Sequence, residues 1–273
     1  MNNSENILVS VVMATFNEPK TFIEKSISSI LAQTHKNLEL LIADDSTKEE
    51  TISVIDNFAR RDKRVVVIRK EERMGFINAL NSCLDCAKGD LIARMDGDDI
   101  SLPDRFEKQI QYYESHPDVI IWGGNIDIIN ENEEIISERL YPTTSASIRR
   151  MFMFRSPFAH PTVMLQRRIV DEGFRYNPEY KKDEDLDLWL RLYNKGYIFG
   201  NTGEKLLNYR VVGDITGKRD RSQLVYNHKT RSENFNWRKP IFSIVSWTAS
   251  LLYLAVPMKL FTVIYRKENS RKL

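Results

Sequence analysis

Three groups of acidic residues stand out in this 273-residue chain, because each has the residue types to bind a cation or to move a proton. They lie at residues 44–45, 96–99 and 183–187. Mg²⁺ is typically held by one or two carboxylates together with the phosphates of a ligand. Each group alone also fits an ordinary turn or the start of a helix. Their presence together predicts a site that binds a divalent cation and a phosphate.

Alternating apolar and amphipathic segments indicate how the chain positions these groups. Short apolar runs, each typical of a strand buried on both faces, occur at residues 7–14, 38–43, 65–68 and 91–95. Segments with helical spacing separate them, at residues 22–31, 52–58 and 76–84. This alternation predicts an α/β fold with a mostly parallel sheet. Because ligands bind at the carboxyl ends of parallel strands, we expect the acidic groups at 44–45 and 96–99 to face one crevice.

The later part of the chain has a less regular pattern and shows no internal repeat. It predicts helices at 103–115 and 186–193, strands at 119–122, 162–165 and 205–212, and a hairpin over 126–140. The third acidic group therefore precedes a helix. A pattern of this kind favours a single domain that continues the sheet.

The composition excludes several classes of protein. An apolar fraction of 42% and a charged fraction of 29% are globular values, so the chain is not disordered as a whole. A net charge of +2 is too balanced for a dedicated nucleic-acid-binding protein. Two cysteines are too few for a disulfide scaffold or a four-cysteine zinc site. No basic residue precedes Lys20, so we expect no secretory signal peptide and a cytoplasmic protein.

Six motifs give the chain a resemblance to glycosyltransferase family 2, whose members are inverting nucleotide-sugar transferases of GT-A fold. The motifs are SVVMATFNE (10–18), SILAQT (29–34), LELLIADDS (38–46), NALNSCLDCAKG (78–89), IARMDGDDISLPDR (92–105) and EDLDLWLR (184–191). They follow the family's order and spacing over roughly residues 7–212. The run at 93–101 is similar to transferases that build bacterial exopolysaccharide, capsule or O-antigen repeats.

The resemblance implies a nucleotide-binding role for five residues. Thr15, Asn17 and Glu18 fall on the family's first nucleotide loop. Asp45 matches the aspartate that reads the base, usually uracil, through its N3–H. Asp96 matches the residue near the ribose and the sugar.

The resemblance also implies where the chemistry occurs. Asp98 matches the metal-binding position of the family's D-x-D motif, with Mg²⁺ or Mn²⁺ as the expected cofactor. Asp185 matches the catalytic base of the Glu-Asp motif, in which Glu184 is the other member. The chain has no convincing Ser-His or Cys-His pattern for a nucleophile, which fits a single displacement without a covalent intermediate.

Three further residues match the family less closely. His160 lies where the family often has a histidine near the diphosphate or the acceptor, although a structural histidine fits as well. Arg210 belongs to a late Tyr-Arg pair that approaches the phosphates in the family, but Val211 stands where many relatives have a histidine. Arg73 stands where relatives often have an asparagine before a glycine.

The implied architecture is a GT-A domain over residues 1–235 followed by a helical tail over residues 236–273. The nucleotide-binding half is expected at 1–100 and the acceptor and catalytic half at 101–235. The tail is apolar and basic: the segment 229–273 carries nine basic and two acidic residues, a net of +7, which leaves −5 on the rest.

The tail has three possible placements. Residues 240–258 form a stretch of nineteen without a charge, which is roughly long enough to cross a bilayer as a helix. Ser243, Ser246, Thr248, Ser250 and Pro257 within it argue against a span. We favour a helix, or a pair of helices, that lies on the cytoplasmic face of the cell membrane. Packing on the catalytic domain is the third placement.

The expected function is transfer of a sugar from a UDP-sugar to a hydroxyl of a lipid-linked saccharide, in the synthesis of a cell-surface polysaccharide. One alternative is a sugar nucleotidyltransferase, which is expected to have a glycine-rich, basic loop after the first strand. Residues 14–18 contain neither glycine nor a basic residue. A dehydrogenase would need G-x-G-x-x-G there. The other alternative is a non-catalytic, membrane-bound protein that binds a nucleotide or saccharide; the joint presence of Asp45, Asp98 and Asp185 argues against it.

Overall fold

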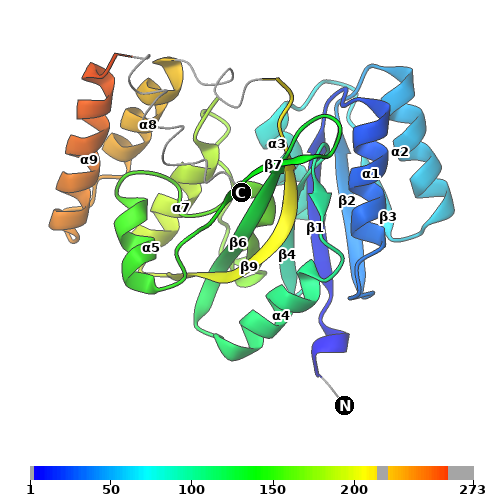
Figure 1. Cartoon of the computed structure of the whole chain (residues 1–273), viewed down its shortest axis with the longest axis horizontal. Helices are drawn as coiled ribbons and strands as arrows, with labels where there is room; N and C mark the ends of the chain where they lie inside the picture. Colours follow the sequence, from blue (N-terminus) through cyan, green and yellow to red (C-terminus); the bar gives the residue numbers. More distant parts are fainter. Residues whose placement is uncertain (1–2, 214–220, 258–273) are drawn as a thin grey trace.

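The computed structural model describes residues 3–213 and 221–257, and in it helices cover both faces of one sheet (Figure 1). The strands are β1 (Val9–Thr15), β2 (Leu38–Asp44), β3 (Val65–Ile68), β4 (Leu91–Asp96), β5 (Ile100–Ser101), β6 (Val119–Ile129), β7 (Ile135–Arg139), β8 (Met164–Gln166) and β9 (Ile198–Arg210). The longer helices are α1 (Lys20–Leu31), α2 (Glu49–Arg61), α3 (Phe76–Cys86), α4 (Arg105–Ser115), α5 (Ser145–Phe152), α7 (Glu184–Lys195), α8 (Arg221–Glu233) and α9 (Pro240–Ala255). Short helical turns are η1 (Asn3–Asn6), η2 (His160–Thr162) and α6 (Arg168–Asp171).

The strands run in the order β3-β2-β1-β4-β8-β6-β9-β5, with β7 paired to β6 outside this path. Neighbours among β3, β2, β1 and β4 are parallel, while β8 is antiparallel to both β4 and β6. The α/β prediction is confirmed, and each of the first four strands lies within two residues of its predicted bounds. The parallel order brings the ends of β1, β2 and β4 to one edge.

Two apolar cores lie on opposite faces of the sheet, because successive side chains of a strand point to opposite sides. Val11 and Met13 of β1 belong to the core under α1, α2 and α4. Val12 and Ala14 belong to the core that also takes in α3 and α7. Strands buried on both faces need continuous apolar runs, which is why the sequence signals them so clearly.

The second half of the sheet differs from the sequence expectation. The strand predicted at 119–122 and the first arm of the hairpin at 126–140 are one long strand, β6, and the hairpin itself is formed by β6 and β7. Gly123 and Gly124 lie in the middle of β6 without ending it. A Cβ on Gly124 would lie 2.5 Å from the Leu206 side chain of β9, so glycine allows the two strands to approach. The predicted strand 205–212 begins earlier, at Ile198.

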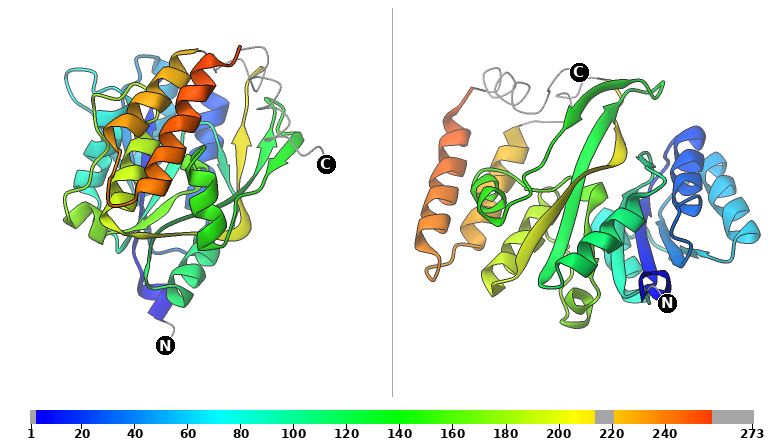
Figure 2. Two further views of the ribbon diagram at one scale, coloured as in Figure 1. Left: turned by 90° about the vertical axis from the view of Figure 1, so that its left-hand side faces the viewer. Right: turned by 60° about the horizontal axis from the view of Figure 1, so that its bottom comes forward.

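The helical tail begins on the domain rather than away from it. α8 and α9 lie side by side at the edge of the molecule remote from α1 and α2 (Figures 1 and 2). Phe242 of α9 is buried, with ring centroids 5.6 Å from Phe152 and 4.4 Å from Tyr193. The inner face of α9 therefore packs on the domain, as in the third of the predicted placements.

The outer face of α9 is apolar and exposed, with Ile241 77% and Leu252 63% exposed. Within 3–213 and 221–257, no helix is both long and apolar enough to cross a bilayer. Residues 258–273 of the predicted tail lie outside the described residues.

Candidate active site

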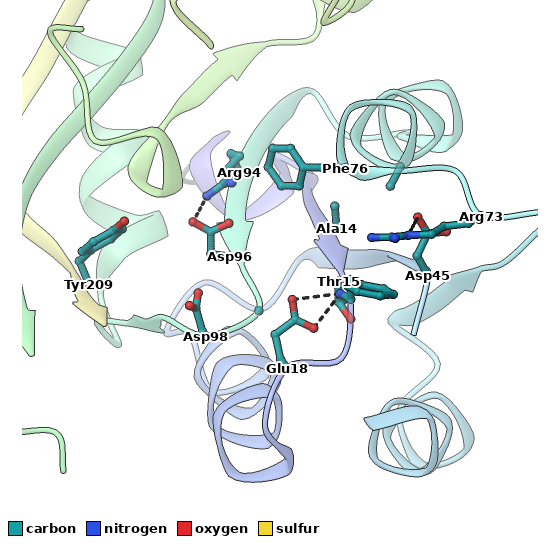
Figure 3. A pocket seen from close by; sticks show the side chains of 13 residues that line it. Ala14, Thr15, Glu18, Asp45, Arg73, Phe76, Arg94, Asp96, Asp98 and Tyr209 are labelled. Atoms are coloured by element: carbon teal, nitrogen blue, oxygen red, sulfur yellow. Dashed lines mark hydrogen bonds and ion pairs between the residues drawn. The ribbon is translucent and has the colours of Figure 1, made fainter. Parts of the chain in front are cut away.

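A cavity of about 350 Å³ opens at the carboxyl ends of β1, β2 and β4, where the first two acidic groups were expected to meet (Figure 3). The residues singled out from the sequence that line it are Thr15, Glu18, Asp45, Arg73, Asp96 and Asp98. Those that lie outside its lining are Asn17, His160, Glu184, Asp185 and Arg210. The structure thus brings together the strand-end residues of three parallel strands in one cavity.

Asp45 directly follows β2 and is fixed by the turn that leads into α3. Its carboxylate accepts hydrogen bonds from the backbone N–H groups of Met74 (3.0 Å) and Gly75 (2.6 Å). Gly75 has a φ of +74°, which favours glycine. The Arg73 guanidinium stacks on the Phe16 ring, 3.7 Å from its centroid, and its Nε lies 4.0 Å from the Asp45 carboxylate. This end of the cavity therefore offers a fixed carboxylate beside an aromatic face.

The loop after β1 contributes the floor of the cavity. The Thr15 and Glu18 side chains line it, and the Glu18 carboxylate accepts the backbone N–H two residues earlier in the chain. Burial raises the pKa of Glu18. The Asn17 side chain points elsewhere: its Oδ1 accepts hydrogen bonds from the backbone N–H groups of Thr47 and Lys48, both at 2.8 Å. Asn17 thus ties this loop to the loop after β2.

Arg94 of β4 is a buried cation in the cavity wall, with 5% of its surface exposed. Its guanidinium forms an ion pair with Asp96, as Figure 3 shows. It also lies 5.7 Å from the centre of the Phe76 ring. Burial and the Arg94 charge together hold the pKa of His160 well below its usual range. The Arg94 charge therefore acts both on Asp96 at the end of β4 and on His160.

Asp96, Asp98 and Asp99 form the part of the site that fits a metal ion. One carboxylate oxygen from each lies within 4.8 Å of the others, and such an all-oxygen set suits Mg²⁺ or Mn²⁺. Burial, with the two neighbouring carboxylates, raises the pKa of Asp99 well above its usual range. Arg210 of β9 holds this loop by two hydrogen bonds. Its backbone N–H donates to the Asp99 carboxylate (2.8 Å), and its Nε donates to the Asp98 backbone carbonyl (2.8 Å).

Helix α7 carries the third acidic group. Glu184 and Asp185 form its first turn, where the Leu186 backbone N–H donates to Asp185 Oδ1 at 2.7 Å. Burial raises the pKa of the Tyr176 phenol; the Arg94 charge lowers it, and the charges of Asp185, Glu184 and Asp96 raise it. The carboxylates of α7 and of β4 therefore both act on the same buried phenol.

His160 lies behind the site in a buried aromatic cluster. Its Nε2 is 2.9 Å from the Tyr176 hydroxyl, and its ring centroid is 6.0 Å from that of Trp189 in an edge-to-face contact. Its lowered pKa favours the neutral form of this half-buried ring.

Glu184 gives the protein a specific pH dependence of stability. Burial and the adjacent Asp185 charge raise the pKa of Glu184 to about 7. Between its usual value and pH 7 the folded state then holds more protons than the unfolded state, so the free energy of unfolding falls as the pH rises. We expect the wild type to lose about 1–3 kcal/mol more than Glu184→Gln between pH 5 and pH 8. Urea unfolding at several pH values measures this, and parallel curves for the two proteins would contradict it.

Four functional candidates were not found from the sequence: Phe16, Phe76, Arg94 and Tyr209 all line the cavity. Phe16 lies within the motif at 10–18, and Tyr209 is the tyrosine of the late Tyr-Arg pair, so both positions were visible in the sequence. Arg94 precedes Asp96 by two positions, so strand alternation puts both side chains on one face, and this signal was available. Nothing local distinguished Phe76, which begins α3.

Comparison with known proteins agrees with the fold and the strand-end site. The family model for glycosyl transferase family 2 matches residues 10–174. An O-antigen biosynthesis glycosyltransferase, WbnJ of Escherichia coli, is 37% identical over 77% of this chain and 82% of its own length. An uncharacterized glycosyltransferase of Methanocaldococcus jannaschii is 31% identical over 94% of this chain and 89% of its own length. The chain therefore belongs to glycosyltransferase family 2, as its motifs predict.

Solved structures confirm the GT-A fold. Residues 1–349 of TarS from S. aureus, in complex with UDP-GlcNAc, superpose with a TM-score of 0.64 at 17% sequence identity. The match covers 83% of this chain and 66% of that one. In a longer TarS structure, the match covers 39% of the TarS chain. At this identity the likeness concerns the fold alone.

Proposed function

We propose that this protein transfers a sugar from a nucleoside-diphosphate sugar, with UDP as the nucleotide, to a hydroxyl of a saccharide acceptor, and inverts the anomeric centre. The observation that carries this proposal is the single cavity in which Asp45, Asp96 and Asp98 meet at adjacent strand ends. Membership of glycosyltransferase family 2 supports it. The names of similar proteins, which include O-antigen and amylovoran biosynthesis glycosyltransferases, support a role in polysaccharide synthesis.

The nucleotide would lie along the cavity from Asp45 toward Asp98. Asp45 is an acceptor for the N3–H of uracil, and the exposed Phe16 ring beside it offers a stacking surface. Arg73 covers that ring at 3.7 Å and would have to share or leave the face when a base binds. Thr15 and Glu18 would border the ribose, next to Asp96.

Asp98, with Asp96 and Asp99, would hold Mg²⁺ or Mn²⁺ against the diphosphate. When bound, such an ion neutralises the negative charge that grows on the leaving nucleoside diphosphate. Arg210 fixes the loop that carries these carboxylates by two hydrogen bonds, so the donor oxygens are oriented before the ligand arrives.

Asp185 is the proposed general base. Its carboxylate would take the proton of the acceptor hydroxyl, whose oxygen attacks the anomeric carbon from the side opposite the leaving phosphate. The C–O bond to the acceptor forms as the bond to the diphosphate breaks, so one displacement inverts the centre. Glu184 beside it has a pKa raised to about 7, so it is protonated for part of the physiological range.

The acceptor is proposed to be lipid-linked, because the chain carries a surface suited to a membrane. α9 exposes Ile241, Ile244 and Leu252 on its outer face, and the exposed Arg238 precedes it. An apolar helix face with a basic residue at its start suits the anionic surface of the cytoplasmic leaflet. The protein would then bind peripherally on that face of the cell membrane.

Point variants test this surface better than deletion of α9, because deletion would uncover Phe242 and its partners. We expect Ile241→Ser/Leu252→Ser to weaken binding to phosphatidylglycerol vesicles by more than about 100-fold, since each of the two aliphatic side chains contributes about 1.5–3 kcal/mol when it is buried. Val66→Ser, on the exposed edge strand β3, is the matched control. Equal vesicle binding by all three proteins in a flotation assay would contradict the membrane proposal.

A thermal-shift panel tests the nucleotide part of the proposal. UDP, GDP, TDP and CDP are each added with and without Mn²⁺, and a ligand of the folded state raises the melting temperature by mass action. We expect a shift with UDP that needs Mn²⁺. The absence of a shift with any nucleotide would favour a non-catalytic protein.

A further inference from the structure

Helix α8 and the residue after it make four side-chain contacts with the segment 180–187, which leads into α7 and contains Asp185. The Gln223 side-chain amide donates to the Asp183 carboxylate, and the Lys182 Nζ donates to Ser222 Oγ at 2.6 Å. The Tyr180 hydroxyl donates to Glu233, and the Asn234 Nδ2 donates to Asp187 Oδ1 at 2.9 Å. These contacts join residues 40 to 53 positions apart in the chain. The segment around Asp185 is thus held from outside α7.

The segment has a reason to need support. Asp183, the residue before the first turn of α7, has φ 62° and ψ 24°, a left-handed conformation that is unfavourable for most residues with a side chain and that aspartate adopts more readily than most. Its carbonyl nevertheless accepts the Asp187 backbone N–H at 2.9 Å, so this residue sets where α7 begins. A hydrogen bond to the Asp183 side chain stabilises that conformation and, with it, the direction of the next two side chains.

α8 is itself fixed on its other side. Arg231 is buried, and its guanidinium donates to the Phe152 carbonyl (3.0 Å) and to Ser246 Oγ of α9. His228 Nδ1 lies 2.9 Å from Ser250 Oγ, also on α9. α8 therefore contacts the core of the domain, α9 and the segment before α7. Figure 2 shows the three helices α7, α8 and α9 next to one another.

We propose that α8 is a clamp that positions the Asp185 carboxylate, with Gln223 and Asn234 as its positioning residues. The inference rests on the proposed role of Asp185 as the general base. Neither residue touches the cavity, so neither would bind the donor. Their contribution is to the angle and distance at which Asp185 meets the acceptor hydroxyl, and misplacement by about 1 Å can cost on the order of 100-fold in rate.

The experiment compares steady-state transfer by Gln223→Ala, Gln223→Glu, Asn234→Ala and Val225→Ala in the full-length chain, with UDP-sugar donors and Mn²⁺. Gln223→Glu keeps the size of the side chain but faces Asp183 with a second carboxylate, so it loses the donated hydrogen bond and adds repulsion. Val225 is exposed on the same helix and serves as the control. The fraction of folded, donor-competent protein is measured by titration calorimetry with UDP, and the melting temperature is recorded.

We expect kcat per donor-binding site to fall 10- to 100-fold in Gln223→Ala, and further in Gln223→Glu, while the KM for the donor stays within twofold. Val225→Ala should match the wild type. A fall in donor-binding sites with unchanged kcat per site would show a merely structural role and would overturn the clamp. Wild-type kcat in both Gln223 variants, alongside an inactive Asp185→Asn, would overturn the clamp alone. A wild type that binds no nucleotide would overturn the proposed function and the clamp with it.

Discussion

Asp185→Asn is expected to bind the donor as the wild type does and to transfer at least about 100-fold more slowly. A positioned general base contributes about 10²–10⁴ in rate, and an amide of the same shape cannot accept the hydroxyl proton. The Asn side chain can still accept the Leu186 backbone N–H that now bonds to Asp185 Oδ1, so the start of α7 is preserved. Donor-dependent UDP release and the thermal shift with UDP and Mn²⁺ measure the two halves of this prediction.

The matched control for this variant is Asp171→Asn, an exposed carboxylate of α6 with an ion pair to Arg167. It carries the same chemical change away from the cavity and should leave kcat unchanged. Removal of the Asp185 charge should also lower the pKa of Glu184, because that charge is one of its two main causes. Transfer within threefold of the wild type would remove Asp185 from the mechanism and would make Glu184 the next candidate.

The first half of the fold was predictable because burial on both faces leaves a strong pattern. β1, β2 and β4 are mostly apolar runs that are buried on both faces, and β3 is a short apolar run at the edge of the sheet. The helices between them have a regular apolar face. The second half was less predictable because tertiary contacts decide its boundaries. β6 continues through Gly123 and Gly124 only because β9 packs against them, and a sequence pattern indicates a break there.

Helix α8 shows the limit of pattern reasoning most clearly. Its buried residues are Leu224, Thr230 and Arg231, so it has no apolar stripe for a periodicity argument to detect. Polar contacts to α9 and to the segment before α7 fix it instead. Such contacts depend on where distant residues meet, which a single sequence does not record.

The candidate site likewise has residues that could be assigned from the sequence and residues whose role depends on tertiary contacts. Asp45, Asp96 and Asp98 could be assigned to one crevice because strand ends of a parallel sheet share an edge. Asn17 and Arg210 carry the residue types of a ligand site, yet the structure uses Asn17 to join two loops and Arg210 to brace the Asp98 loop. Residue type and position along the chain do not distinguish a side chain that lines a cavity from one that supports its wall.

Asp98→Ala is expected to abolish the Mn²⁺-dependent binding of UDP and, with it, transfer. At a UDP concentration 100-fold above its Kd, binding stabilises the wild type by about 2.7 kcal/mol, or roughly 5–10 °C in melting temperature for a chain of this size. Loss of one of three clustered carboxylates should remove most of that shift. Asp104→Ala, an exposed carboxylate in the same stretch of chain, is the control and should keep the shift.

The melting temperature without ligand distinguishes a lost ligand from a damaged fold. Asp98 is one of two neighbouring charges that raise the pKa of buried Asp99, so its removal relieves repulsion in the unliganded protein. The variant should therefore melt at or above the wild-type temperature while it fails to respond to UDP and Mn²⁺. A lower melting temperature would instead mean that Asp98 supports the loop, as Arg210 does. A UDP shift in the wild type that does not need Mn²⁺ would retain the nucleotide site and exclude the metal from it.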